Sequence, residues 1–206
     1  MADDKFMFQS IAQQKNAAGI SDADRRASAK WFRDEAGKVS QDAFDPEFHM
    51  ANALPFQNRP NLSVNSIGKL YSFVYDPKTK DKLPYYDTFP LIFPISFEST
   101  CMLGINLHYL SPWHRAKLMN ALYTTLNNDK YNSTTKLKIS YGILKGASQF
   151  ELFKPCIKKY LFSHVRSTFM NYNPKVWDYC LSLPMAQFQK KTQEVVWMES
   201  LMKVNR

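Results

Sequence analysis

The segment from Leu91 to Phe97 constrains the fold most strongly, because it is almost entirely apolar and yet contains a proline. A short continuous apolar run bounded by turn residues is typical of a strand that is covered on both faces. Pro94 has no backbone N–H, so it must lie at a sheet edge or at a bulge. The run therefore predicts a buried strand with a local irregularity.

Two further runs flank this strand and complete a predicted antiparallel meander over residues 69–110. The first run spans residues 70–75 and the third spans residues 102–107, and both are rich in β-branched and aromatic residues. Polar turns that contain proline, aspartate or serine separate the three runs. We place the core of the protein in this sheet and expect burial of Phe73, Ile92, Ile95 and Leu107.

Helical and strand patterns follow the meander. Residues 111–126 begin with a capping serine and a proline and predict a helix, and residues 134–148 predict a second one. Residues 176–183 have the length and aromatic content of a strand that returns to the sheet. Residues 185–204 predict a final helix, with inward positions at Phe188, Val195, Met198 and either Leu201 or Met202.

Residues 154–171 give the best helical pattern in the chain, because their apolar residues recur at the spacing of one helix face. On this interpretation Ile157, Tyr160 and Val165 point inward. Lys159 and Arg166 would then lie on the outer face of the helix and Lys158 at its flank, and with Lys154 they form the predicted basic face.

The first 66 residues differ from the remainder and predict a partly helical N-terminal arm, with a helix at 21–36 and an irregular connector at 41–66. Residues 67–206 form the core domain. Two interpretations of the arm stay open, since it either packs on a partner subunit or folds back on its own sheet. Its apolar residues are candidates for an interface, namely Phe6, Phe8, Trp31 and Phe32.

The chain carries 27 Lys and Arg against 18 Asp and Glu, a formal net charge of +9. Residues 130–166 hold most of this excess, and tyrosines lie among the lysines. Such a surface suits nucleic acid, because cations displace counterions and aromatic rings stack on exposed bases. A solvated face or a face for an acidic subunit fits the same pattern. The predicted DNA- or partner-binding residues are Lys136, Lys138, Lys145, Lys154, Lys158, Lys159 and Arg166.

The sequence favours a protein without catalysis, cofactor or metal. The three cysteines lie in apolar surroundings, which is typical of buried thiols in a reducing compartment. His108 is expected to be a hydrogen-bonded structural residue, and turn chemistry accounts for Asp76, Asp81 and Asp87. No apolar run reaches the length that spans a bilayer. We therefore expect neither a membrane contact nor a small-molecule substrate.

Three motifs together resemble a family of small virion proteins from large contractile-tailed, T-even-like bacteriophages. They read FVYDPKTKDKLPYYDTFPL at 73–91, LGINLHYL at 103–110 and FKPCIKKYL at 153–161. Members of this family are usually labelled DNA end protectors. The resemblance implies binding of double-stranded DNA ends near the head–tail junction of a virion assembled in the host cytoplasm, with other virion proteins as neighbours.

We therefore expect an α+β fold in which a small, strongly bent antiparallel sheet is surrounded by helices. Closure of this sheet into an SH3-like barrel stays open as an alternative. The expected function is a non-enzymatic virion protein that contacts DNA ends. The alternative is a structural connector of the baseplate, tail or neck that contacts only protein, and a nuclease-like head-completion enzyme is the least favoured.

Overall fold

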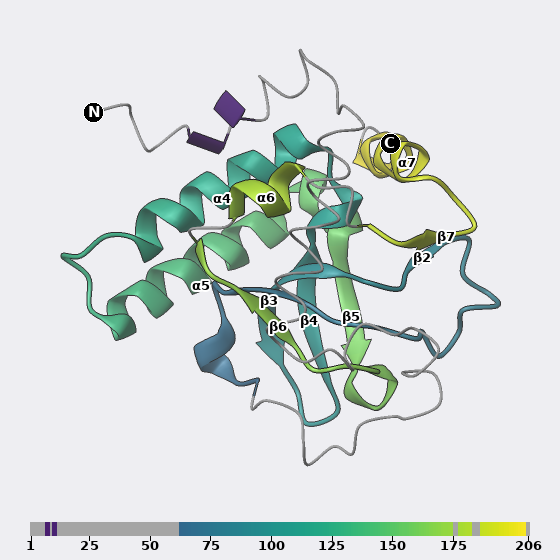
Figure 1. Cartoon of the computed structure of the whole chain (residues 1–206), viewed down its shortest axis with the longest axis horizontal. Coiled ribbons are helices and arrows are strands. Elements are labelled where there is room, and N and C mark those ends of the chain that lie inside the picture. The colour runs from purple at the N-terminus through teal and green to yellow at the C-terminus, as the bar shows by residue number, and fades with distance from the viewer. Residues whose placement is uncertain (1–6, 9, 12–61, 175–176, 183–185, 205–206) are drawn as a thin grey trace.

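A five-stranded antiparallel sheet forms the centre of the molecule, and helices pack beside it (Figure 1). The computed structural model describes residues 7–8, 10–11, 62–174, 177–182 and 186–204. The predicted α+β class is confirmed. Within the described residues the sheet stays open between two edge strands, so the alternative of a closed barrel is wrong.

The strand order in the sheet is β5-β4-β3-β1-β6. Three neighbouring strands, β1, β3 and β4, come from the predicted meander, and every pairing in the sheet is antiparallel. The meander is thus confirmed as the centre of the sheet. The strand bounds are Leu70–Ser72 for β1, Leu91–Phe97 for β3, Cys101–Asn106 for β4, Ile157–Leu161 for β5 and Met170–Tyr172 for β6.

The proline in β3 produces the predicted irregularity. Pro94 pairs with Gly104, but Ser96 pairs with Leu103, so the register shifts by one residue between them. The missing N–H of proline is accommodated by this bulge in a central strand, as expected from its inability to donate to the ladder. Gly104 permits close packing here, because a Cβ at this position would lie 3.0 Å from Cδ1 of Ile92.

Strand β3 buries side chains on both faces of the sheet, as its continuous apolar run predicts. Leu91 and Phe93 pack in the larger core cluster, which includes helix residues. Ile92 packs in a second cluster on the other face, where Phe73 meets the ring of Tyr160 at 5.3 Å. The expected burial is confirmed for all four predicted residues, Phe73, Ile92, Ile95 and Leu107.

Helices α4 and α5 confirm the two helices predicted after the meander, and they pack against each other (Figure 1). Helix α4 begins at a proline after a serine, and Asn132 caps α5 by accepting a hydrogen bond from the amide of Thr135 at 2.8 Å. Their bounds are Pro112–Leu126 and Ser133–Gln149, and the short 3-10 helices are η4 (Val64–Ser66), η5 (Leu107–Tyr109), η6 (Glu151–Cys156) and η7 (Phe162–His164).

The prediction of one long helix over residues 154–171 is wrong. This segment forms the end of η6, then β5, η7 and β6. Strand β4 pairs along all of β5, from Ile105 opposite Ile157 to Cys101 opposite Leu161. The helical spacing of the apolar residues was coincidental, since long-range pairing with an otherwise open strand outweighed local periodicity.

The strand predicted at residues 176–183 is also wrong, because helix α6 occupies Trp177–Ser182. Its apolar residues Trp177, Cys180 and Leu181 are buried and recur at i, i+3 and i+4, which is helical spacing. The indole of Trp177 lies 5.2 Å from the ring of Phe93, and its N–H donates to the carbonyl of Tyr172 at 3.1 Å. The aromatic content of this segment therefore serves a helix that covers the sheet.

The final helix is shorter than predicted and turns a different face inward. Phe188–Gln189 forms strand β7, which pairs with β2 (Tyr86–Asp87), and helix α7 spans Gln193–Val204. Val196 is fully buried, whereas three of the residues predicted to face inward are exposed, namely Met198, Leu201 and Met202. Phe188 packs against the core as predicted.

The N-terminal segment contributes at least one residue to the chain's own core. Phe8 is fully buried, its ring lies 5.2 Å from Tyr123, and its amide donates to the side-chain oxygen of Asn120 at 2.9 Å. Phe8 therefore packs on its own domain rather than presenting its side chain at the surface. The remaining predicted arm residues, Phe6, Trp31 and Phe32, and the helix predicted at 21–36 lie outside the described residues.

Candidate functional site

A groove opens beside β5 where three segments that are distant in sequence meet, and its volume is about 420 Å³. Residues within 75–87 come from the segment before β3, which includes β2, and residues 158–161 come from β5. Lys203 comes from α7, and the ends of β4 and η5 add Asn106 and Tyr109. In Figure 1, β2, β5, β7 and α7 lie on one side, opposite the turn that joins α4 and α5. We call it the tyrosine–lysine groove, since it is lined by Tyr75, Tyr85, Tyr86, Tyr109 and Tyr160 with Lys78, Lys158, Lys159 and Lys203.

A buried carboxylate lies at the floor of this groove. Asp87 follows the paired residue Tyr86 in β2 and is 4% exposed. One carboxylate oxygen accepts from the amides of Phe89 at 3.0 Å and Gln187 at 3.3 Å. The other accepts from Asn106 at 3.1 Å and contacts Nδ1 of His108 at 2.7 Å. Four donors therefore hold one carboxylate, which satisfies a charge that would be costly to bury alone.

His108 is neutral and donates its Nδ1–H to Asp87. Burial lowers the pKa of His108, and the nearby charge of Arg115 acts in the same direction, against the attraction of Asp87. Nε2 of His108 is buried with no hydrogen-bond partner among the described residues. A bare nitrogen lone pair is tolerated there far better than an unpaired N–H of an imidazolium. Burial works to raise the pKa of Asp87, but the hydrogen bonds and the His108 contact outweigh it and lower that pKa.

The network continues from the floor to the groove wall through Asn106. The Asn106 amide also lies 3.1 Å from the hydroxyl of Tyr160, and its oxygen accepts from the amide of His108 at 2.9 Å. Burial raises the pKa of Tyr160 well above its ordinary value, so this hydroxyl stays protonated. The wall of the groove is therefore fixed by side chains that are already hydrogen-bonded, which preorganises its shape.

A second buried charge, Arg115, attaches the C-terminal helix to this floor. Its Nε–H donates to the carbonyl of Leu110 at 2.8 Å, and its guanidinium lies 5.4 Å from the centre of the Trp197 ring. Burial lowers the pKa of Arg115 to about 10, which leaves it charged at neutral pH. The Trp197 N–H donates to the carbonyl of His108 at 2.8 Å. Helix α7, which carries Lys203, is thereby held against the floor.

Three of the four lysines that line the groove form no ion pair with a carboxylate of the described residues, namely the exposed Lys78 together with Lys158 and Lys203. The Lys158 ammonium lies 4.1 Å from the centre of the Tyr109 ring, in the range of a cation–π contact. Burial lowers the pKa of Lys158 to about 8, and the positive charge of Lys203 acts in the same direction. Among the described residues, neither Lys158 nor Lys203 forms an ion pair with a carboxylate.

The other cations around the groove are already engaged. Lys159 lies 3.5 Å from Glu98, and Lys191 pairs with Glu199. Lys190 donates to three backbone carbonyls of the 80–83 turn, including that of Leu83 at 2.7 Å. These contacts leave Lys78, Lys158 and Lys203 as the groove lysines without a carboxylate partner among the described residues, and of these only Lys158 and Lys203 lie over aromatic rings.

The basic residues predicted from the sequence do not share one face. Lys138 and Lys145 are exposed on α5, and Lys154 pairs with Glu151 in η6. Arg166 lies 3.6 Å from Asp76. Both lysines of β5 line the groove, but only Lys158 lies over the Tyr109 ring, whereas Lys159 pairs with Glu98.

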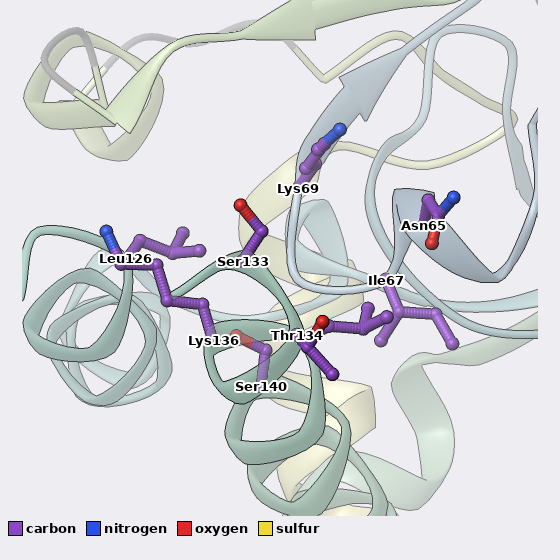
Figure 2. Close-up of a pocket in the computed structure, with 9 residues that line it drawn as sticks. Asn65, Ile67, Lys69, Leu126, Ser133, Thr134, Lys136 and Ser140 are labelled. Atoms are coloured by element: carbon purple, nitrogen blue, oxygen red, sulfur yellow. The ribbon is translucent and has the colours of Figure 1, made fainter. Parts of the chain in front are cut away.

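A second hollow of about 380 Å³ lies between η4 and the first turns of α5, and Lys136 lines it. Ser140 is fully buried beneath Gly68, and its hydroxyl has no partner among the residues that the structure describes. Figure 2 shows Lys69 and Lys136 extending in different directions, so their amines do not converge on Ser140. This hollow therefore lacks the paired cations of the tyrosine–lysine groove.

Sequence reasoning missed the residues that build the groove. Asp87 was assigned to a turn, and Asn106, Tyr109 and Lys203 were not singled out. Strand alternation at Lys158 and Tyr160 was the available signal, and it was hidden by the competing helical spacing. Within the described ranges, no group of three His, Cys, Asp or Glu residues is arranged to hold a metal ion, and no helix is long and apolar enough to cross a membrane.

Comparison with known proteins gives one match. Residues 55–203 match the family model described as Phage T4 terminal DNA protecting protein, which covers all of the groove and most of the chain. No curated protein and no solved structure matches the chain.

Proposed function

We propose that this chain, which belongs to the Phage T4 terminal DNA protecting protein family, is a non-enzymatic virion protein that binds the ends of packaged double-stranded DNA. The family description supplies the ligand class, namely a DNA terminus. We place the protein near the head–tail junction, because a packaged DNA end that needs protection must be held where the genome enters and leaves the head.

The observation that carries this proposal is the pair of uncompensated lysines in the tyrosine–lysine groove. Lys158 lies in a partly dehydrated part of the groove and forms no ion pair among the described residues, so it attracts phosphate more strongly than a fully solvated lysine does. The floor of the groove is rigid, because Asp87 is held by four donors. A fixed surface with positive charge is what a phosphate backbone requires.

Of the seven basic residues predicted from the sequence, we propose that Lys158 contacts the DNA and that Lys159 lies at the rim of the contact. The lysines of α5, Lys136, Lys138 and Lys145, contribute to the positive field that draws DNA towards the protein. Such long-range attraction accelerates association and is screened by salt.

The test compares linear and closed circular DNA of the same sequence. Purified protein is titrated against linear fragments of several lengths at equal total mass, over a series of salt concentrations. End binding predicts that binding capacity follows the number of ends, whereas internal binding follows the number of base pairs. In parallel, an exonuclease that starts only at ends should digest protein-bound linear DNA more slowly than free DNA.

Two results would refute end binding. The first is equal affinity for linear and circular DNA, which would mean that ends are not recognised. The second is the absence of any DNA binding at low salt, where the electrostatic contribution is largest. The second result would leave the connector function as the explanation.

A second candidate function, a connector that contacts only protein, is favoured by one observation on α7. Met198 is 53% exposed and Met202 is 59% exposed, and Leu201 lies on the same side of the helix. Clustered exposed apolar side chains often mark protein interfaces. Replacing both methionines with glutamine should reduce incorporation into particles while DNA-end binding persists. Unchanged incorporation would contradict the connector function.

A further inference from the structure

The ammonium of Lys158 is partly shielded from water and has no carboxylate partner among the described residues. Its ammonium lies over the Tyr109 ring at 4.1 Å, and Tyr109 is itself 5% exposed, so water reaches this charge from few directions. Removing an ammonium from water is costly unless an opposite charge or several acceptors replace the lost hydration. The described residues place no carboxylate within ion-pair distance of it.

A second cation lies close by and increases this imbalance. Lys203 also lines the groove, and its charge disfavours the protonated form of Lys158. The ammonium of Lys203 lies 5.9 Å from the centre of the Tyr85 ring, so it too faces an aromatic side chain rather than an acid. Two positive side chains that line one groove and form no ion pair among the described residues favour an anion as their partner.

The number of charges indicates which anion. A phosphodiester inside a DNA strand carries one negative charge, whereas a phosphate monoester carries about 1.5 to 2 at neutral pH. Two lysines match the monoester better than the diester. In DNA, a phosphate monoester occurs only at the end of a strand, and it is the group that distinguishes a terminus from the interior.

We infer that Lys158 and Lys203 bind the terminal phosphate monoester of a DNA strand in the tyrosine–lysine groove. This inference rests on the proposed function and specifies how an end is recognised. Phosphate oxygens between the two ammonium groups would form charge-assisted hydrogen bonds, and Tyr109 and Tyr85 would hold the lysine stems in place. The same chemistry is available on the 5′ and on the 3′ terminus, so the test separates the two.

The experiment measures the affinity of the full chain for blunt duplexes that differ only at their termini. The four ligands carry 5′-phosphate, 3′-phosphate, hydroxyl groups at every terminus, or no terminus at all in a closed circle. We expect one of the phosphorylated duplexes to bind about tenfold more tightly than the hydroxyl duplex, the size of one charge-assisted hydrogen bond. The phosphorylated duplex that binds more tightly identifies whether the protein recognises the 5′ or the 3′ end of the strand.

Matched variants assign the effect to the two lysines. Lys158→Gln and Lys203→Gln should each reduce the preference for phosphate, and Lys203 is exposed, so its variant is expected to fold normally. Lys145→Gln removes an equally positive side chain that lies on α5 and should leave the preference unchanged. Melting temperatures of all three variants show whether a loss of binding reflects a loss of fold.

Failure of this inference is distinguishable from failure of the proposed function. If phosphorylated and hydroxyl duplexes bind equally but both bind better than the circle, the terminal-phosphate inference is overturned and end binding stands. The inference is also overturned if the preference survives in both Lys158→Gln and Lys203→Gln. If no linear duplex binds better than the circle, the proposed function itself fails.

Discussion

The protein has two lysine-rich regions that look alike in sequence and differ in their surroundings. On α5, the ammonium of Lys145 lies 5.9 Å from the centre of the Tyr141 ring, and Tyr141 is 41% exposed. In the groove, Lys158 lies 4.1 Å from the ring of Tyr109, which is 5% exposed. The same pair of residue types is thus solvated in one place and partly dehydrated in the other.

The density of positive charge along a sequence therefore locates a positive field, but it does not locate a binding site. Lys138 and Lys145 of α5 are exposed to water, and screened charges contribute little to a specific contact. The groove has a rigid floor, aromatic walls and few neighbouring acids, so an anion there meets charges that water screens less. The two regions differ in how far their lysine–tyrosine pairs are removed from water, and that difference depends on the fold.

The largest expected effect comes from the groove floor. Asp87→Ala leaves the buried Nδ1–H of His108 and the buried amide of Phe89 without their acceptor, and such losses cost about 3–5 kcal/mol of unfolding free energy. Lys145→Ala on α5 removes an exposed side chain and should change stability by less than about 0.5 kcal/mol. Chemical denaturation of both variants measures the contrast. Equal stability of the two variants would mean that the groove floor contributes no more to stability than the exposed surface of α5 does.

The second expected effect concerns the attachment of α5 to the sheet. Gly68 has a φ of +85°, and a Cβ there would lie 2.6 Å from Cβ of Ser140. Gly68→Ala should therefore cost about 1–3 kcal/mol through backbone strain and overpacking.

The matched control for this variant is Gly142→Ala, on the helix α5 that Gly68 contacts through Ser140. A Cβ at Gly142 meets nothing within 4 Å, and alanine is favoured over glycine inside a helix by about 0.5–1 kcal/mol. Thermal unfolding should thus shift in opposite directions for the two variants. Destabilisation by both variants would contradict a specific role of the close contact between Gly68 and Ser140.

The third effect is a loss of stability on acidification that originates in the floor of the tyrosine–lysine groove. The pKa of His108 is below its ordinary value of 6.5 in the folded chain, owing to burial and to Arg115. The unfolded chain therefore takes up a proton at this residue that the folded chain refuses, so stability present above pH about 6.5 falls as the pH drops below it. Asp87, whose pKa is also lowered from 3.8, adds a further loss below pH about 4.

Melting temperatures at pH 7.5, 6.5 and 5.5 measure the first of these two losses. His108→Gln should flatten the dependence in this range, although the variant is less stable overall. His114→Gln is the control, because partial burial lowers the pKa of His114 and gives a contribution of the same sign from outside the floor. A decline that is unchanged in His108→Gln would contradict a neutral buried His108.

The smallest effect is on the salt dependence of DNA binding. Each lost phosphate contact reduces the slope of log affinity against log salt by about 0.9 for duplex DNA. The double variant Lys158→Gln/Lys203→Gln should reduce the slope by about that amount or twice it. Lys138→Gln/Lys145→Gln should leave the slope nearly unchanged, since these side chains are not expected to touch phosphate. Equal reductions in both double variants would place α5 in the contact.

The sequence was sufficient for the parts of the fold that local chemistry determines. The bulge at Pro94 follows from a missing N–H, and the start of α4 follows from the proline at its first position, whereas the serine before it makes no side-chain capping bond. The core residues of the meander follow from a continuous apolar run. In each case the deciding interaction lies within a few residues of the signal, so a pattern along the chain suffices.

The groove depended on long-range contacts that no local pattern encodes. Residues 157–161 satisfy helical spacing as well as strand alternation, and only the pairing with β4 decides between them. Asp87 and His108 are 21 positions apart, and their contact follows from the way the loop before β3 folds onto η5. Lys203 reaches the groove because Arg115 and Trp197 hold α7 in place.

Strand β5 ends the sheet, and this position has a consequence for the behaviour of the protein in concentrated solution. An edge strand offers unpaired amides and carbonyls to any other chain, and charged side chains are a common barrier to such edge-to-edge association. Lys158 and Lys159 occupy this edge, and the hydroxyl of Tyr75 covers the amide of Leu161 at 3.2 Å. If two copies met along β5, four lysines would be brought together. Neutralising these lysines therefore lowers the barrier to aggregation, and solubility should decline with each charge removed from β5.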